Sequence, residues 1–212
     1  MHAFVPISLE AGVRLDVDGV TVRGWRGDAL VTAAPCFGMV TEGPVQIDEG
    51  GDQLRLRAGM HFVLPAGAWI AGGRGLLIEV PGPAPLRTFG GPIEARGRLW
   101  YIDGCTDSLI VGPARRGEPC LNHLHIPAST LQSAHTHPSI RVGVIARGSG
   151  VCVTPNGRWP LAAGLGWVIP TGVEHSFHTS TEALDVIAWH PDSDTGPTDE
   201  DHPMVNRTVL RR

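Results

Sequence analysis

One stretch of the chain occurs twice, and this internal repeat is the strongest constraint on the fold. Residues 58–70 read AGMHFVLPAGAWI and residues 163–175 read AGLGWVIPTGVEH, so that Ala, Gly, Val, Pro and Gly keep their places. The copies lie 105 positions apart in a chain of 212 residues, and Gly43 and Gly148 keep the same offset. Self-similarity of this kind indicates a duplicated structural unit. The sequence therefore predicts two related domains, residues 1–90 and 91–212, joined near 81–93, where Pro and Gly cluster.

The local pattern predicts an all-β fold. Short runs rich in Val, Ile and Leu alternate with turn residues from a pool of 28 Gly and 18 Pro, and no long stretch has helical periodicity. Many short strands at this spacing are typical of a sandwich or barrel. The expected strands are residues 19–23, 30–33, 45–47, 53–57, 62–64, 76–80, 109–111, 121–126, 142–146, 151–153, 167–169 and 183–189.

Composition excludes several classes of function. All 17 basic residues are Arg, which removes lysine Schiff-base chemistry and a P-loop lysine. The Arg are scattered and the net charge is −4, so we expect no nucleic-acid partner. No apolar run reaches the roughly 18 residues of a membrane span, and no signal peptide is visible, so a cytoplasmic protein is expected. The four Cys show no CxxC pair, which argues against a disulfide framework or a cysteine zinc site.

Three histidines in the second half have the spacing of metal ligands. His135 and His137 alternate along the chain, so in a strand both imidazoles face the same side. His175 ends the second copy of the repeat, at the position where the first copy has Ile70. Three neutral imidazoles favour a transition metal over Mg²⁺ or Ca²⁺, which prefer oxygen ligands.

These residues resemble the two motifs of the cupin superfamily, G(x)5HxH(x)3–4E(x)6G and G(x)5PxGxxH(x)3N. The first matches His135, His137 and Gly148, with Ser129 in place of its leading Gly, and the second matches Gly164, Pro170, Gly172 and His175. The resemblance implies two tandem cupin barrels (double-stranded β-helix, or jelly-roll), that is, a bicupin. It also implies one divalent transition metal per chain, held by His135, His137 and His175 in the C-terminal barrel. Fe(II) is favoured, and Zn, Ni, Co or Cu are alternatives.

Two departures from the family pattern matter. The acidic ligand of the first motif is replaced by Arg141, which either forks to a substrate carboxylate or turns away into a structural ion pair. In the first half, the counterpart of the His pair lies near residues 30–32 and the third ligand is Ile70. We therefore expect a degenerate N-terminal barrel without metal ligands.

Further residues of the second half are candidates for the site. His123 and His125 alternate on one strand and are expected to face the interior, as proton relay or as partners of the metal ligands; the alternative is a structural pair bonded to carbonyls. Phe177 shares the face of His175, His178 is expected outside the barrel, and Trp167 and Trp189 are expected in the core. The polar run at residues 190–203 is either a solvated loop or a lid over the barrel mouth.

The leading hypothesis is a non-haem Fe(II) oxygenase acting on a small carboxylate-bearing substrate. Arg141 would bind the carboxylate, and His123 or His125 would relay a proton. The alternatives are a redox-neutral metal-dependent isomerase, lyase or decarboxylase, an N–N bond-forming biosynthetic cupin, and a non-catalytic binding module. An anionic small molecule is the expected partner, no membrane partner is expected, and the resemblance implies a homodimer.

Overall fold

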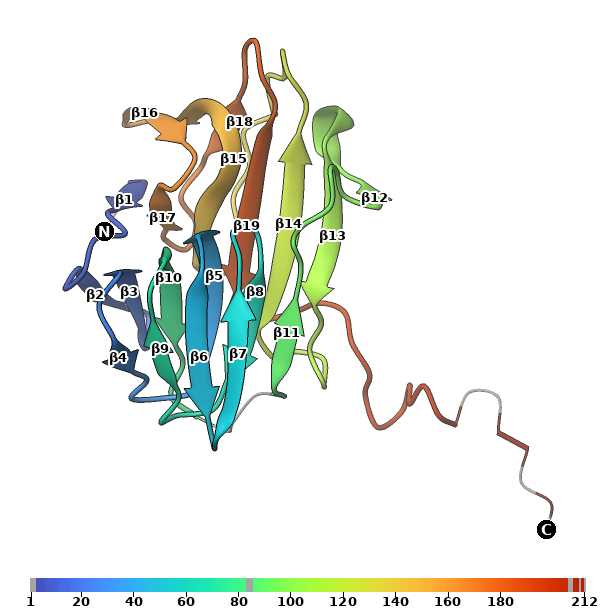
Figure 1. Ribbon diagram of the computed structural model, residues 1–212. Helices are drawn as coiled ribbons and strands as arrows, with labels where there is room; N and C mark the ends of the chain where they lie inside the picture. Colours follow the sequence, from blue (N-terminus) through green and yellow to red (C-terminus); the bar gives the residue numbers. More distant parts are fainter. Residues whose placement is uncertain (1–2, 83–85, 206–207, 210, 212) are drawn as a thin grey trace.

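A computed structural model describes residues 3–82, 86–205, 208, 209 and 211 of the protein (Figure 1). The described part consists of antiparallel β-sheets and one short 3-10 helix, Ile102–Gly104, so the all-β prediction is confirmed. Three residues of the predicted join at 81–93 lie outside the described residues. No helix of the described part is long and apolar enough to cross a membrane.

Strands between residues 14 and 90 form two sheets. The six-stranded sheet has the order β11-β8-β5-β10-β3-β2 and the four-stranded sheet has the order β4-β9-β6-β7. Their bounds are β2 (Arg14–Val17), β3 (Val20–Arg26), β4 (Leu30–Val31), β5 (Cys36–Glu42), β6 (Val45–Glu49), β7 (Asp52–Leu56), β8 (His61–Leu64), β9 (Trp69–Ala71), β10 (Arg74–Glu79) and β11 (Thr88–Gly90).

The second half forms a nine-stranded sheet that also takes in the first strand of the chain. Its order is β1-β17-β15-β19-β14-β13-β12, and β16 and β18 pair with β15. The bounds are β1 (Val5–Ile7), β12 (Leu99–Trp100), β13 (Thr106–Val111), β14 (Cys120–Ile126), β15 (Arg141–Thr154), β16 (Gly157–Ala162), β17 (Gly166–Ile169), β18 (Ser176–His178) and β19 (Leu184–His190). Strand β1 therefore belongs to the sheet of the second half, although its residues lie in the segment 1–90 predicted as the N-terminal domain.

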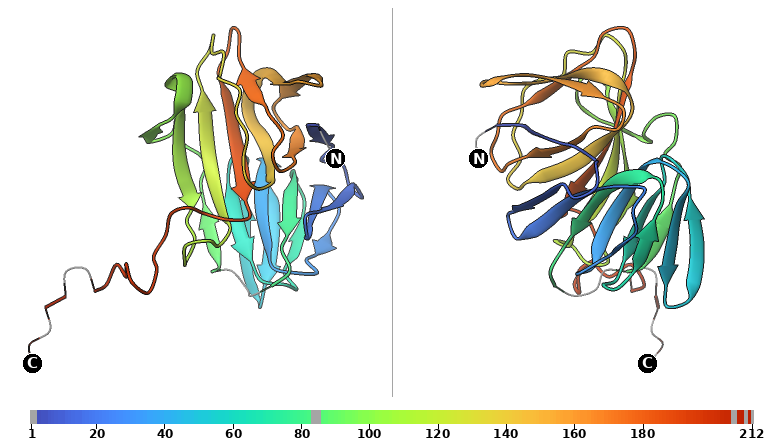
Figure 2. Two further views of the ribbon diagram at one scale, coloured as in Figure 1. Left: turned by 180° about the vertical axis from the view of Figure 1, so that it is seen from behind. Right: turned by 60° about the vertical axis from the view of Figure 1, so that its left-hand side comes forward.

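Each half has its own apolar interior, and a third cluster lies between the halves. The first interior includes Trp25, Phe62 and Ile70, and the second includes Ile145, Trp167 and Phe177. The third cluster draws on both halves, from Phe37 and Met39 to Leu121, Val142 and Trp189. Figure 2 shows the two bodies of strands stacked against each other. Alternation along the strands produces this arrangement, because neighbouring residues point to opposite faces of a sheet.

The internal repeat is visible in the backbone hydrogen bonds. Leu30 pairs with Ile70 in the first half, and His135 pairs with His175 in the second, each residue 105 positions before its counterpart. The amide of Gly67 donates to Thr32 O at 2.9 Å, and that of Gly172 donates to His137 O at 2.9 Å. These two glycines have φ of 85° and 71°, a left-handed conformation that glycine adopts without strain. The two halves therefore share one backbone frame.

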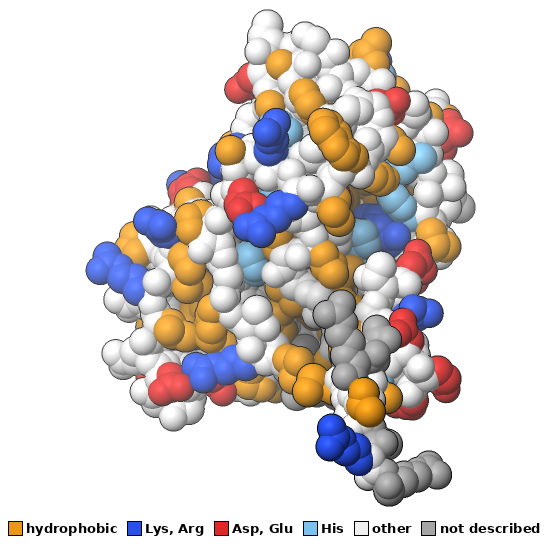
Figure 3. Space-filling view, turned by 90° about the vertical axis from the view of Figure 1, so that its right-hand side faces the viewer, with side chains coloured by type: hydrophobic (Ala, Val, Ile, Leu, Met, Phe, Trp, Pro, Cys, Tyr) orange, Lys and Arg blue, Asp and Glu red, His pale blue; other side chains and the backbone are white. Residues whose placement is uncertain are grey.

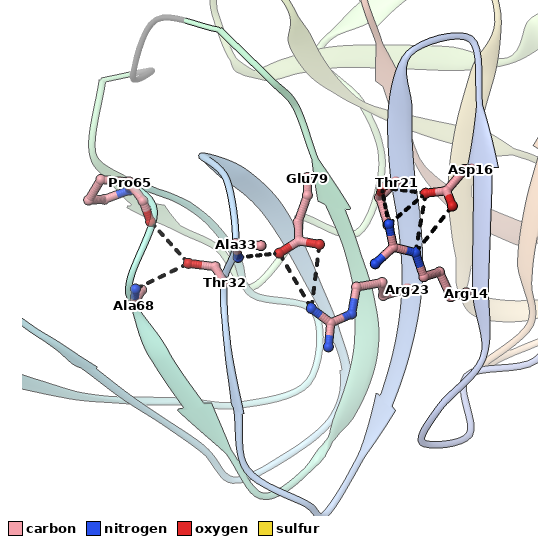
Figure 4. A network of polar contacts seen from close by, with 9 residues as sticks. All are labelled: Arg14, Asp16, Thr21, Arg23, Thr32, Ala33, Pro65, Ala68 and Glu79. Atoms are coloured by element: carbon pink, nitrogen blue, oxygen red, sulfur yellow. Dashed lines mark hydrogen bonds and ion pairs between the residues drawn. The ribbon is translucent and has the colours of Figure 1, made fainter.

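Other side chains fill the corresponding place in the first half. The Thr32 hydroxyl donates to Pro65 O at 3.2 Å and accepts from the Ala68 amide at 3.1 Å (Figure 4). Nearby, the buried Glu79 carboxylate accepts from the Ala33 amide at 2.6 Å and from Arg23 at 3.4 Å. Ile70 is fully buried. At the three positions that carry histidine in the second half, the first half thus has Leu30, Thr32 and Ile70.

We predict that Leu9→Ala strongly destabilises the fold. Leu9 is fully buried in the cluster between the halves. Its backbone lies close to Gly24 and its side chain close to Gly166, where an added Cβ would be 2.8 Å from Leu9 Cα and 2.9 Å from Leu9 Cδ2, respectively. Loss of the side chain should cost about 2–5 kcal/mol of the free energy of unfolding in urea. Leu99→Ala, at a site that is 65% exposed, is the control and should change it by less than about 0.5 kcal/mol. A small effect of Leu9→Ala would contradict a tightly packed junction.

Candidate metal centre

His135, His137 and His175 converge in the second half. Their ring centroids are 4.6–5.1 Å apart, and the candidate ligand atoms all lie within 4.8 Å of one another. His135 and His175 are held by a mutual backbone bridge, with N–O distances of 3.0 and 2.9 Å. Within the part of the chain that the structure describes, this is the one group of three His, Cys, Asp or Glu side chains close enough to share a metal ion.

Backbone carbonyls orient two of the imidazoles. His135 Nδ1 lies 2.9 Å from Ser133 O, and His175 Nδ1 lies 2.9 Å from Val173 O. Since a carbonyl oxygen only accepts, each Nδ1 carries the proton and each Nε2 has its lone pair available. A hydrogen bond from the second ring nitrogen is the usual way in which proteins fix a histidine ligand.

The surroundings of His137 and His175 favour the neutral imidazole, which is the form that binds a metal. Burial lowers the pKa of His137 to about 3, and the positive charge of Arg141 adds to the effect. Burial likewise lowers the pKa of His175 to about 4, although its bond to Val173 opposes the shift. The ring of Phe177, 5.8 Å from that of His175, forms an apolar wall on the predicted face.

Arg141 lies in the same interior, with one guanidinium nitrogen already occupied. Its Nη1 donates to Ser139 O at 3.2 Å, to Ser139 Oγ at 2.6 Å and to Ile140 O at 3.1 Å. The buried Nε has no hydrogen-bond partner among the described residues. Burial lowers the pKa of Arg141. An unpaired buried donor costs about 1–3 kcal/mol, so this nitrogen is suited to an incoming acceptor.

His190 is a further candidate site residue, named in the sequence analysis only as the first residue of the polar run 190–203. Val142 pairs with Trp189 and Cys120 with His190, so Arg141, His190 and Cys120 form one row across β15, β19 and β14. Burial, followed by the charge of Arg141, lowers the pKa of His190 to about 4. The predicted strand ended at residue 189. Strand β19 in fact ends at His190. Val186 and Ala188 pack in the second interior, so alternation along the strand places His190 on the same face.

The expectation that His123 and His125 face the barrel interior is wrong. They do share a face, because His123 Nε2 and His125 Nδ1 lie 2.8 and 2.9 Å from the same Asp185 oxygen. That face is the one of Leu121 and Ile187, which belong to the cluster between the halves. Leu124 and Ile126 take the interior face instead, since apolar side chains fill that core. The contacts of both histidines thus go to Asp185, and their catalytic role stays a prediction.

The two tryptophans and His178 lie where the sequence predicted them. Trp167 is buried in the interior of the second half, and Trp189 is buried in the cluster between the halves. His178 bonds Ser176 Oγ at 3.0 Å, on the strand face opposite Phe177. Residues 191–203 have no helix or strand, and they contact residues 115–117 through Gly117 N–Ser193 O and Arg116 N–Pro197 O bonds of 3.0 Å. Histidine side chains gather beside a basic side chain on the face shown in Figure 3.

Comparison with known proteins identifies the fold. No protein-family model and no curated protein sequence matches the chain. A cupin 2 conserved barrel domain protein from Leptotrichia buccalis superposes with a TM-score of 0.59 and 10% identity over 90% of this chain and 89% of that one. The protein has the cupin fold. AerE from Microcystis aeruginosa gives a TM-score of 0.61 at 14% identity, over 89% of this chain and 96% of AerE.

A third similar structure is an enzyme. Salicylate 1,2-dioxygenase from Pseudaminobacter salicylatoxidans gives a TM-score of 0.57 at 15% identity over 81% of this chain and 70% of the dioxygenase. A variant of the dioxygenase has also been solved in complex with gentisate. At these identities the likeness establishes the cupin fold alone.

We predict that protein stripped of metal by a chelator loses stability between about pH 6.5 and pH 4. The folded pKa values of His137, His175 and His190, about 3, 4 and 4, lie below the ordinary value of 6.5, so the unfolded chain binds protons that the folded chain does not. Each imidazole then contributes a slope of up to about 1.4 kcal/mol per pH unit, with stability falling as pH falls. Urea unfolding measured at several pH values in this range gives the free energy of unfolding as a function of pH. This free energy should fall less steeply with pH in His190→Gln than in the parent, whereas His202→Gln, in the exposed C-terminal segment, should match the parent. Equal slopes for all three proteins would contradict the burial of His190.

Proposed function

We propose that this protein is a metal-dependent bicupin enzyme with one working site, a non-haem Fe(II) oxygenase acting on a small carboxylate-bearing substrate. The observation that carries the proposal is the convergence of three imidazoles, with ligand atoms within 4.8 Å of one another. Three nitrogen donors without a carboxylate suit Fe(II), Zn, Ni, Co or Cu. A bound ferrous ion would supply the redox chemistry that an oxygenase requires.

The donor set fits such an ion. Ser133 O and Val173 O fix the His135 and His175 rings, so that both Nε2 atoms are available. His137 completes the set, and its low pKa removes competition from protons at neutral pH. In the first half, Leu30, Thr32 and Ile70 stand in place of the three ligands, which supports a single site per chain.

The other residues of the interior would handle the substrate. Arg141 would bind the carboxylate through its unpaired Nε, and Phe177 would keep water from one side of the site. His190 stands next to Arg141 in the cross-strand row and is neutral at physiological pH, so it is placed to accept a proton from a substrate hydroxyl. We assign the proton-transfer role to His190 ahead of His123 and His125. A cytoplasmic location and a homodimeric assembly also belong to the proposal.

We predict near-stoichiometric iron in protein purified anaerobically, and loss of most of that metal in His175→Ala. Removing one of three ligands leaves too few nitrogens to retain the ion, and mass spectrometry of the purified proteins measures the content. His178→Ala, three residues away on the other strand face, is the matched control and should keep its metal. Full occupancy in His175→Ala would show that the ligand set is wrong.

Admission of air separates the two catalytic alternatives. An optical change of the iron-loaded protein supports the oxygenase and calls for an O2-uptake screen with small acids. Bound zinc, nickel or cobalt without a response to air would favour redox-neutral isomerase, lyase or decarboxylase chemistry, in which the metal polarises a carbonyl. No metal, even after reconstitution, would overturn the enzyme proposal.

We predict that Arg141→Met weakens the binding of a simple acid by tenfold or more and leaves the metal content unchanged. The variant keeps the length of the side chain and removes the charge and the donors, so calorimetric titration with benzoate reports on the carboxylate contact alone. Arg158→Met, on the exposed strand β16, is the control. Unchanged benzoate binding in Arg141→Met would retire Arg141 as an anion site.

A further inference from the structure

A carboxylate of the chain itself already stands beside Arg141. Arg141 Nη1 lies 3.9 Å from Asp192 Oδ1, and the Ser139 hydroxyl connects them. This hydroxyl accepts from Nη1 at 2.6 Å and donates to Oδ1 at 2.6 Å. The Arg141 side chain is 10% exposed and that of Asp192 is 51% exposed, so a surface carboxylate partly neutralises a buried cation.

The loop that carries Asp192 is fixed on both sides of it. The residue lies two positions after His190, the last residue of β19. Its carbonyl oxygen lies 3.9 Å from Cys120 Sγ, and the next carbonyl, Ser193 O, accepts from the Gly117 amide at 3.0 Å. Further along, the Arg116 amide donates to Pro197 O at 3.0 Å. These backbone contacts hold the carboxylate at the edge of the site.

This charge acts on every anion that approaches Arg141. Like charges a few ångströms apart repel, and the repulsion grows in proportion to the charge of the incoming molecule. A monocarboxylate meets one unit of this repulsion, and a dicarboxylate meets more. Beside Arg141, the charge of Asp192 therefore favours an acid with a single negative charge.

We propose that Asp192 is a specificity-determining residue of the candidate site, which selects monoanionic acids and rejects dianionic ones. This inference rests on the proposed role of Arg141 as the anion-binding residue. It narrows the substrate class to acids with one carboxylate and no second anionic group.

The test compares benzoate and phthalate as probes, titrated by calorimetry into the metal-free full chain. Asp192→Asn retains the hydrogen bond to Ser139 and removes only the charge. We expect it to tighten benzoate binding roughly threefold and phthalate binding roughly tenfold, with both gains shrinking as salt is added. Asp201→Asn makes the same change of charge further along the same segment and should alter neither affinity.

The outcomes separate this inference from the proposed function. Weaker binding of Arg141→Met than of the parent, combined with no gain in Asp192→Asn, would overturn the role of Asp192 and leave Arg141 as the anion site. An equal gain in affinity for benzoate and phthalate in Asp192→Asn would show that Asp192 does not select acids by their charge. Loss of affinity in Asp192→Asn would show that Asp192 positions Arg141 instead of competing with the ligand. No benzoate binding to the parent or to Asp192→Asn would retire Arg141 and this inference together.

Discussion

The same short backbone pairing recurs in both halves, and the site is built on it. His135 pairs with His175 as Leu30 pairs with Ile70, and the Gly172 and Gly67 turns close both arrangements with equivalent hydrogen bonds. Main-chain atoms make these contacts, so the frame tolerates either imidazole or aliphatic side chains. Imidazoles on this frame form a cluster of metal-binding nitrogens in the second half. Aliphatic side chains at the equivalent positions of the first half pack as part of its apolar interior. The difference between the halves lies in side chains mounted on equivalent backbone.

A cluster of imidazoles next to a guanidinium is held in place by the surrounding packing. Burial disfavours the charged forms of His137, His175 and His190, and the charge of Arg141 adds to this effect at all three. The guanidinium is in turn tied by the carbonyls of Ser139 and Ile140 and faces Asp192. The polar residues around the guanidinium thus come from the ends of β15, β19 and β14 and from the loop that follows β19. The three candidate ligands come from the segments before β15 and β18.

Sequence reasoning predicted the features that depend on spacing. The repeat, the three histidines and the Leu30–Ile70 counterpart follow from positions in the chain, and the structure brings each set together. Ser129, which replaces a motif glycine, even adopts φ of 60°, the left-handed conformation that glycine would take there. Features that depend on tertiary context were missed. Strand β5, which was not predicted, runs continuously through Gly38, whose missing side chain makes room for the Phe62 ring. Strand β15 runs through the two stretches predicted as separate strands. The face of His123 was missed for the same reason, since both faces of β14 are buried and alternation alone does not say which is interior.

Strand β1 makes the two halves inseparable by a simple cut. Val5, Pro6 and Ile7 pair with residues 166–168, far along the chain, while residues 14–90 form the other body. A nick in the 81–93 join would leave the N-terminal fragment holding an edge strand of the C-terminal sheet, so the two pieces would remain associated as a complementing pair. During synthesis the same strand has to wait until β17 has been made before it can pair. Contacts between such distant segments slow folding, so this N-terminal strand is expected to dock late.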